Sequence, residues 1–329
     1  MKLSDFDYNL PKELIAQYPL KDRISCRLLV LNRQKATIEH RRFSDLKDYL
    51  KKDDLLVLND SKVLPCRLIG KRITGGKVEI LLLNRKSGVT FEALIKPARV
   101  KLGEKIIFKD KNISCKISAK NEVTFSACDI EEIYSIGVMP LPPYIKREPQ
   151  GLDNIYYQTV YAKEEGSVAS PTAGLHFTQD FLREIQKSGL NIAYITLHVG
   201  YATFKPVKSE DITRHVMGRE YFRIKDDAIK LIDQTQEKGA SICAVGTTSC
   251  RVLETYACGQ REGFTDLFIY PGYKFKIVNH LLTNFHLPKT TLFMLVAAFA
   301  GKDLIRKAYA EAVEKKYRFY SYGDAMLIL

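Results

Sequence analysis

Short apolar segments alternate with turn residues between residues 62 and 127. Valine, isoleucine, leucine and phenylalanine dominate each segment, and glycine, asparagine, aspartate or serine separates it from the next. Strands spaced by about ten residues are typical of a small antiparallel barrel or sandwich. The predicted strands are 63–72, 77–84, 89–96, 104–109, 113–119 and 122–127.

The rest of the chain alternates between strand and helix patterns. Strands are predicted at 54–59, 192–199, 241–245, 265–270 and 325–329. Thr178 and Asp226 are suitable N-caps for two helices, and further helices are expected after the turn at 246–248, at 290–300 and at 303–316. This alternation predicts an α/β fold, in which a layered α/β domain of residues 1–61 and 137–329 carries an inserted basic β-barrel domain of residues 62–136.

Composition narrows the class of protein. A chain of 329 residues with 46% hydrophobic residues is expected to form about two globular domains. The longest apolar run, Leu292 to Ala300, has nine residues, fewer than the about 20 that cross a bilayer, and the first residues do not resemble a signal peptide. Seven cysteines without a Cys-x-x-Cys pair predict neither a disulfide framework nor a zinc site. We therefore expect a cytoplasmic protein that does not contact membranes.

Positive charge is concentrated in the predicted barrel. Residues 62–125 contain 15 Lys and Arg residues against five Asp and Glu residues, a net charge of +10 out of +13 for the whole chain. Such a segment attracts a polyanion, because each phosphate that it neutralises releases a counterion. A lysine-rich surface that only maintains solubility explains the charge equally well.

Four turns rich in small residues are candidates for binding a ligand. Small residues beside a helix N-terminus let the backbone approach a ligand and direct N–H groups at it. Loops that leave the carboxyl ends of strands in an α/β domain meet at one crevice, so these turns are expected to line a common site. Each is also explained by a tight turn that begins a helix, and His176 by a structural histidine. The turns are 166–178, 198–204, 246–248 and 283–288.

Several common sites are not indicated. No Gly-Lys-Ser/Thr follows Gly246, and the chain has no Gly-x-Gly-x-x-Gly, which disfavours nucleoside triphosphate and nicotinamide binding. His215, Met217 and Glu220 do not share one helical face, and the six histidines include no His-x-x-x-His pair. The sequence therefore predicts no metal site.

Eight segments, in chain order, resemble the S-adenosylmethionine:tRNA ribosyltransferase-isomerases of queuosine biosynthesis. They are Asn59–Pro65, Ala93–Ala98, Met139–Ile145, Tyr157–Ala162, Ser170–Phe177, Asp266–Tyr273, Thr283–Pro288 and Tyr320–Asp324. The resemblance implies an α/β domain with an inserted β-barrel. It also implies that S-adenosylmethionine is a cosubstrate, whose ribosyl group is transferred and isomerised onto 7-aminomethyl-7-deazaguanine at the wobble position of tRNA with a GUN anticodon. The products are epoxyqueuosine-tRNA, adenine and methionine.

Within this resemblance, residues are assigned by the chemistry that each step needs. Proton transfers require histidines or carboxylates, for which the candidates are His176, His286, His198, Asp266 and Glu220. A cationic sulfur suits an aromatic face, and a carboxylate suits a guanidinium or a helix N-terminus. The candidates for binding S-adenosylmethionine are Thr172, Ala173, Gly174, Phe177, Gly246, Thr247, Thr248, Arg251, Tyr270 and Gly272. The candidates for tRNA phosphates are Lys62, Arg67, Lys96, Arg99 and Lys101.

Two other functions remain open at this stage. A non-catalytic RNA-binding protein would use the basic module for the strand and the α/β domain as a scaffold. An S-adenosylmethionine-dependent methyltransferase is disfavoured, because no Gly-x-Gly turn follows the first strand. We expect a monomer.

Overall fold

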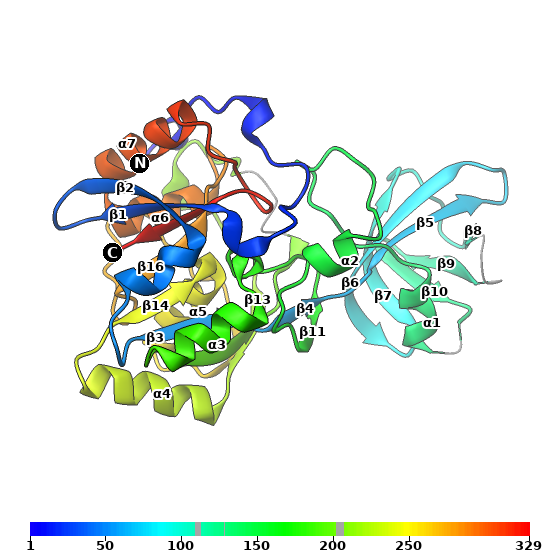
Figure 1. The fold of residues 1–329 in the computed structure, drawn as a ribbon. Helices are drawn as coiled ribbons and strands as arrows, with labels where there is room; N and C mark the ends of the chain where they lie inside the picture. The colour runs from blue at the N-terminus through cyan, green and yellow to red at the C-terminus, as the bar shows by residue number, and fades with distance from the viewer. Residues whose placement is uncertain (109–112, 128, 202–206) are drawn as a thin grey trace. The chain divides into compact units, whose positions relative to one another are not determined.

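The computed structural model describes residues 1–108, 113–127, 129–201 and 207–329. These residues form two compact units (Figure 1). The larger unit comprises residues 1–62, 143–147 and 156–329, and the smaller unit comprises residues 63–142 and 148–155. The larger unit is built on a mixed sheet and the smaller on a closed antiparallel barrel, so the predicted fold class is confirmed.

A nine-stranded sheet forms the centre of the larger unit. Its strands are β1 (Arg27–Asn32), β2 (Thr37–Arg42), β3 (Leu55–Asn59), β12 (Asn191–Leu197), β13 (Glu220–Ile224), β14 (Ile242–Val245), β15 (Glu262–Thr265), β16 (His280–Asn284) and β17 (Ala325–Ile328). Their order is β15-β13-β12-β3-β14-β16-β17-β1-β2. Strands β12, β3, β14 and β16 run parallel to one another, so their carboxyl ends lie at one edge of the sheet.

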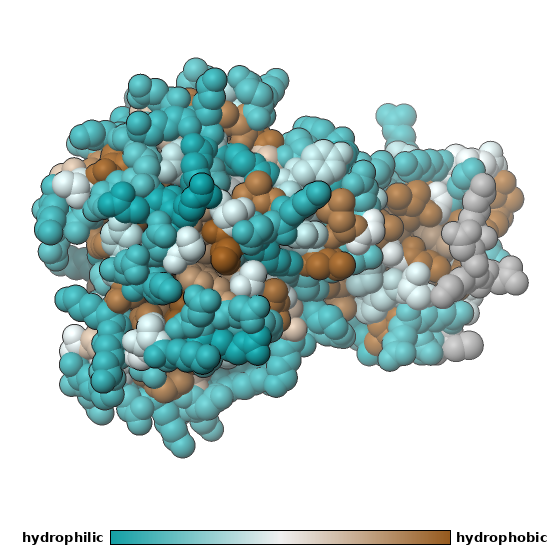
Figure 2. Space-filling model, viewed as in Figure 1, coloured by the Kyte–Doolittle hydropathy of each residue, from teal (hydrophilic) through white to brown (hydrophobic). Residues whose placement is uncertain are grey.

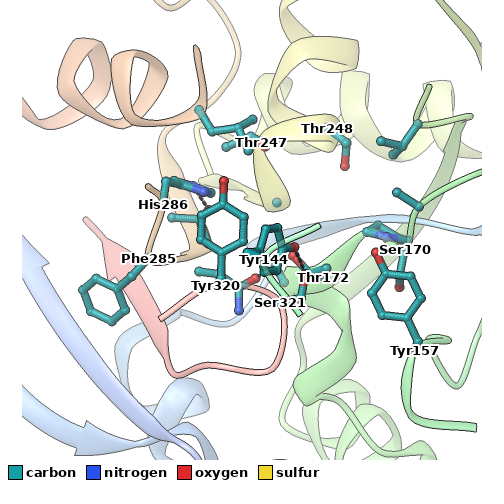
Figure 3. A pocket seen from close by; sticks show the side chains of 18 residues that line it. Tyr144, Tyr157, Ser170, Thr172, Thr247, Thr248, Phe285, His286, Tyr320 and Ser321 are labelled. Atoms are coloured by element: carbon teal, nitrogen blue, oxygen red, sulfur yellow. Dashed lines mark hydrogen bonds between the residues drawn. The ribbon is translucent and has the colours of Figure 1, made fainter. Parts of the chain in front are cut away.

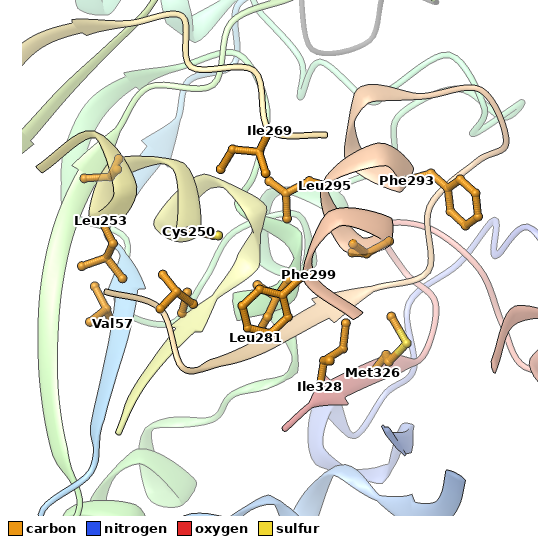
Figure 4. Close-up of a cluster of buried hydrophobic side chains, with 14 of the residues drawn as sticks. Val57, Cys250, Leu253, Ile269, Leu281, Phe293, Leu295, Phe299, Met326 and Ile328 are labelled. Atoms are coloured by element: carbon orange, nitrogen blue, oxygen red, sulfur yellow. The ribbon is translucent and has the colours of Figure 1, made fainter. Parts of the chain in front are cut away.

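Apolar side chains cover both faces of this sheet, which explains why its central strands are apolar throughout. Alternate residues of β3 enter two separate cores, Leu55 and Val57 on one face and Leu56 and Leu58 on the other. The first core includes side chains of α4 (Asp226–Glu237), α5 (Gly246–Tyr256), α6 (Thr291–Ala300) and α7 (Lys302–Glu314). Figure 4 shows the part of this core that α5 and α6 contribute. The second includes side chains of α3 (Gln179–Lys187) and the 3-10 helix η4 (Phe43–Tyr49).

Six antiparallel strands close the barrel of the smaller unit in the order β10-β7-β6-β5-β8-β9. They are β5 (Arg67–Arg72), β6 (Lys77–Ser87), β7 (Thr90–Lys96), β8 (Lys105–Ile107), β9 (Ser114–Ala119) and β10 (Glu122–Phe125). A Cβ at Gly70 would lie 2.6 Å from the Ile106 side chain, so glycine is needed where β5 and β8 pack together. The remaining elements are β4 (Ser61–Val63), β11 (Glu164–Ser167), α1 (Ile130–Ser135) and α2 (Asp153–Tyr156).

Most predicted elements are present. Thr178 is the N-cap of α3 and Thr290 that of α6, since each side chain accepts a hydrogen bond from the backbone of its helix. The N-cap of α4 is Lys225, not the predicted Asp226. The strand predicted at 265–270 is wrong, because β15 ends at Thr265. Strands β1, β2, β13 and β16 were not predicted.

The exposed surface is largely polar. Hydrophilic residues cover most of the face of the larger unit seen in Figure 2. Within the described residues, no helix is long and apolar enough to span a membrane.

Candidate active site

A pocket lies in the larger unit beside the carboxyl ends of β14 and β16 (Figure 3). Residues 169–173, 246–248 and 283–286 line it, together with Val199, Leu292, Tyr144, Tyr157, Tyr320 and Ser321. The structure therefore brings parts of all four predicted turns together, although residues 202–204 of the second turn lie outside the described residues.

The N-terminus of α5 contributes backbone donors to the pocket. Strand β14 ends at Val245 and α5 begins directly at Gly246, whose φ of +89° favours glycine. No side chain caps this helix. The first N–H groups of a helix have no acceptor within it and carry partial positive charge. This end of the pocket is therefore suited to a carboxylate or another anionic group.

Two hydroxyls of the pocket are buried without a partner. Ser170 Oγ and Thr248 Oγ1 have no hydrogen bond within the described residues. Buried polar atoms are usually satisfied, because removing a hydroxyl from water without compensation costs about 1–3 kcal/mol. Both residues line the pocket, so polar atoms of a ligand are suitable partners.

His176 lies behind the pocket and is connected to it by Asn284. Its Nδ1 is 3.1 Å from Cys26 Sγ, and Asn284 Nδ2 donates a hydrogen bond of 3.1 Å to its Nε2. The Asn284 Oδ1 atom accepts a hydrogen bond of 3.0 Å from Thr172. Burial, with smaller effects of Arg23 and Arg318, lowers the pKa of His176 to about 3, so its ring is neutral at pH 7. Asn284 and Thr172 line the pocket, whereas His176 lines a smaller neighbouring cavity.

His286 lines the pocket directly. Its Nε2 is 2.9 Å from Thr283 Oγ1, and its backbone N–H donates to the Tyr309 hydroxyl at 3.0 Å. Burial lowers the pKa of this imidazole to about 3. It therefore holds a lone pair, not a charge, at neutral pH.

Tyr320 adopts a strained backbone conformation at the pocket. Its φ of +73° is rare for a bulky residue. Hydrogen bonds from its N–H to Phe285 O at 3.0 Å and from Gly323 N–H to its carbonyl at 2.8 Å hold the turn. Its ring centroid is 3.8 Å from that of Tyr144, whose hydroxyl is hydrogen-bonded to Ser321. Such strain tends to persist where function requires it.

Comparison with known proteins identifies the family. A family model described as queuosine biosynthesis protein matches residues 3–328. A relative from Sulfurihydrogenibium, named S-adenosylmethionine:tRNA ribosyltransferase-isomerase, is 57% identical over the full length of both chains. The chain belongs to the queuosine biosynthesis protein family.

Other members of this family are similar over the same length. A relative from Thermoanaerobacter with the same name is 49% identical, again over 100% of both chains. The crystal structure of S-adenosylmethionine tRNA ribosyltransferase from Thermotoga maritima has a TM-score of 0.59 and 38% identity, and it covers 99% of this chain and 100% of its own. The resemblance predicted from the eight segments is confirmed.

In this family member, Glu220 and Arg251 bind each other. Arg251 donates a hydrogen bond to Glu220, and both side chains are almost fully buried. Arg251 also donates to Leu267 O at 3.0 Å, and Glu220 accepts from Gly200 N–H at 2.8 Å. Arg251 lines a second cavity, which shares Thr247 and Thr248 with the pocket. Neither side chain lines the pocket itself.

His198 belongs to a different group of polar residues. Its Nδ1 is 2.8 Å from Ser61 Oγ, and its ring stacks on Tyr221 with centroids 5.8 Å apart. A Cβ at Gly166 would lie 2.9 Å from His198 Nε2. Burial lowers the pKa of His198, whereas that of the neighbouring Asp60 is raised by burial. His198 does not line the pocket.

The remaining predicted ligand residues have varied positions. Phe177 is fully buried in the second core against Phe43, and its ring is not presented to the pocket. Gly174 is also buried, and a Cβ there would lie 1.9 Å from the Tyr161 hydroxyl. Tyr270 packs on Phe268, whereas Asp266 and Gly272 are exposed. Of the predicted ligand residues, those that line the pocket are Thr172, Ala173, Gly246, Thr247, Thr248 and His286.

The five predicted phosphate contacts fall into two classes. Lys62 forms a salt bridge of 2.9 Å with Glu165, and Arg67 forms one of 2.9 Å with Glu79. The exposed residues are Lys96, Arg99 and Lys101. No group of three or more metal-ligating side chains occurs among residues 1–108, 113–127, 129–201 and 207–329.

Sequence reasoning missed several lining residues. Ser170 and Asn284 belong to segments that were quoted for the resemblance but were not singled out. Tyr144, Tyr157 and Tyr320 also lie in such segments. The available signal was that Tyr144 follows a proline and Tyr320 precedes a serine, whereas Tyr157 had no such neighbour.

Proposed function

We propose that this protein transfers and isomerises the ribosyl group of S-adenosylmethionine onto 7-aminomethyl-7-deazaguanine at the wobble position of tRNA with a GUN anticodon. The products are epoxyqueuosine-tRNA, adenine and methionine. The observation that supports this most directly is full-length similarity to relatives named S-adenosylmethionine:tRNA ribosyltransferase-isomerase. The pocket gives the reaction a site in the larger unit.

The methionyl carboxylate of the cosubstrate binds at the N-terminus of α5. The first three residues of this helix line the pocket, and no side chain caps it. Arg251, the alternative, already satisfies the charge of Glu220. Moving it to a ligand would separate that buried carboxylate from the guanidinium charge beside it, which is costly.

The other parts of the cosubstrate have suitable partners nearby. Ser170 and Thr248 offer unpartnered hydroxyls to its hydroxyl and amino groups. The aromatic faces of Tyr144 and Tyr320 suit the cationic sulfur. His286 is the histidine that lines the pocket, so it is the candidate for proton transfer there.

The barrel unit contacts the tRNA. We propose that the division predicted from the sequence, with residues 62–136 as the inserted basic domain, is also a division of function. Lys96, Arg99 and Lys101 bind phosphates, since they are exposed. The modified base leaves the stack to enter the pocket. The protein acts in the cytoplasm as a monomer. Size-exclusion chromatography with light scattering tests the oligomeric state.

The decisive experiment measures the small product. The protein is incubated with S-adenosylmethionine and tRNA carrying 7-aminomethyl-7-deazaguanine, and adenine is quantified by chromatography. Free adenine supports the proposal, tight tRNA binding without adenine supports an RNA-binding protein, and S-adenosylhomocysteine supports a methyltransferase. Thr247→Tyr, which fills the pocket, should abolish adenine release, whereas Thr213→Tyr at an exposed position should not.

A further inference from the structure

Asn284 presents a fixed amide to the pocket. It is the last residue of β16 and is 2% exposed. Among the described residues, its side chain accepts a hydrogen bond from Thr172 Oγ1 at 3.0 Å and donates one to His176 Nε2 at 3.1 Å. An amide has two N–H bonds and two lone pairs on its oxygen. One N–H and one lone pair are therefore left for a ligand.

His176 determines how this amide is oriented. Because its Nε2 accepts from Asn284, the neutral ring must carry its proton on Nδ1, which then donates to Cys26 Sγ at 3.1 Å. Burial raises the pKa of the Cys26 thiol, so the sulfur is uncharged. Thr172, Asn284, His176 and Cys26 thus form one chain in which every donor points the same way. An amide rotated by 180° would need the other tautomer of His176, so the ring and the amide are oriented together.

We infer that Asn284 recognises the adenine of S-adenosylmethionine through N7 and the 6-amino group, and that His176 is a positioning residue that orients the amide. This inference rests on the proposed function. Adenine presents an acceptor at N7 beside a donor at its amino group, which is the pattern that an asparagine amide complements. The α5 N-terminus in the same pocket takes the opposite end of the cosubstrate.

The same contact assists the departure of adenine. When the bond from the ribose to N9 breaks, its electron pair moves onto the purine ring. A hydrogen bond donated to N7 stabilises this charge, because it strengthens as the charge develops. No proton passes from Asn284, and the proton that adenine finally needs comes from another group. His176 transfers no proton either, since protein atoms engage both of its ring nitrogens.

An analogue that lacks N7 provides the test. The full-length protein is assayed with S-adenosylmethionine and with its 7-deaza analogue, both for kcat/KM of adenine or deazaadenine release and for dissociation constants without tRNA. With the wild type, we expect the analogue to bind and react about tenfold more weakly than S-adenosylmethionine. With Asn284→Ala, this ratio of S-adenosylmethionine to analogue falls below about threefold. The control Asn191→Ala, in β12 at the opposite end of the sheet, keeps the wild-type ratio.

Further variants separate positioning from folding. His176→Gln supplies an oxygen that accepts the same hydrogen bond, so it should keep more of the ratio than His176→Ala. Far-UV circular dichroism checks that each variant is folded, and a variant that fails is replaced by Thr172→Val, which should also lower the ratio. An unchanged ratio in Asn284→Ala, or no penalty for the analogue with the wild type, overturns the inference. Wild-type binding with the expected ratio but no adenine release overturns the proposed function and leaves the adenine contact standing.

Discussion

Replacing Arg251 by methionine would remove the guanidinium charge beside the buried Glu220 carboxylate. The two side chains are 6% and 3% exposed, so water cannot substitute for the missing guanidinium. Removing one member of a buried pair costs about 3–5 kcal/mol. The lost hydrogen bond to Leu267 O adds about 1 kcal/mol. We therefore expect Arg251→Met to lower the free energy of unfolding by about 4–6 kcal/mol.

Urea unfolding followed at 222 nm measures this loss, because helices α3 to α7 all belong to the larger unit. Glu220→Gln and the double variant Arg251→Met/Glu220→Gln complete a mutant cycle. Glutamine at position 220 still accepts a hydrogen bond from Gly200 N–H but carries no charge. The double variant should therefore be more stable, by about 2 kcal/mol or more, than the sum of the two single losses in unfolding free energy predicts. The opposite result would be that each single variant loses less than about 1 kcal/mol of unfolding free energy, that the two losses add in the double variant, and that S-adenosylmethionine binding weakens. It would refute a structural pair and favour Arg251 as the ligand of the methionyl carboxylate.

Three further predictions follow from buried groups. Ser170→Ala or Thr248→Val should change the unfolding free energy by less than about 1 kcal/mol but weaken S-adenosylmethionine binding, measured by calorimetry, about fivefold. A loss of unfolding free energy as large as the loss of binding free energy would count against a ligand role. The folded pKa of about 3 for His176 and His286 lies below the unfolded value, so the unfolded state binds more protons as the pH falls below about 6.5. Stability at pH 5 should therefore drop by about 2 kcal/mol per histidine, and the corresponding glutamine variants should lose that part of the pH dependence in urea titrations. Gly137→Ala places a Cβ 1.7 Å from Pro65 O and should lower the thermal stability of the barrel by calorimetry, whereas Gly151→Ala, with nothing within 4 Å, should not.

The barrel was predictable because its sequence obeys local rules. Val78, Ile80 and Leu82 are buried and alternate with partly exposed residues along β6, and glycine or asparagine occurs at the turns. The caps of α3 and α6 follow equally local preferences. By contrast, β2 is an edge strand of six mostly polar residues, and only its pairing with β1 makes it a strand. The sequence of β2 has no periodicity that predicts such a pairing.

The site was predictable only in part, for a similar reason. The small-residue turns are local features, and parts of all four line the pocket. By contrast, the residue that a side chain binds can lie far from it in the sequence. Glu220 and Arg251 were each plausible ligands when considered separately, and only the fold shows that they neutralise each other. Tyr320 has a positive φ because its neighbours hold the turn, which sequence alone does not report.

The described lining of the pocket contains no Asp, Glu, Lys or Arg side chain. If the proposed function is correct, hydroxyls, one amide, aromatic rings, one neutral histidine and a helix end bind a cosubstrate that carries both a carboxylate and a sulfonium. Dipoles in a buried site are screened little by salt, whereas surface lysines and arginines that contact phosphates are screened strongly. With three phosphate contacts from Lys96, Arg99 and Lys101, raising salt from about 50 to 200 mM should raise the Kd for tRNA by about 40-fold, at a slope of about 0.9 per contact. The Kd for S-adenosylmethionine should change less than about twofold over the same range. Equal salt dependence of the two ligands would show that charged side chains, not the neutral pocket, hold the cosubstrate.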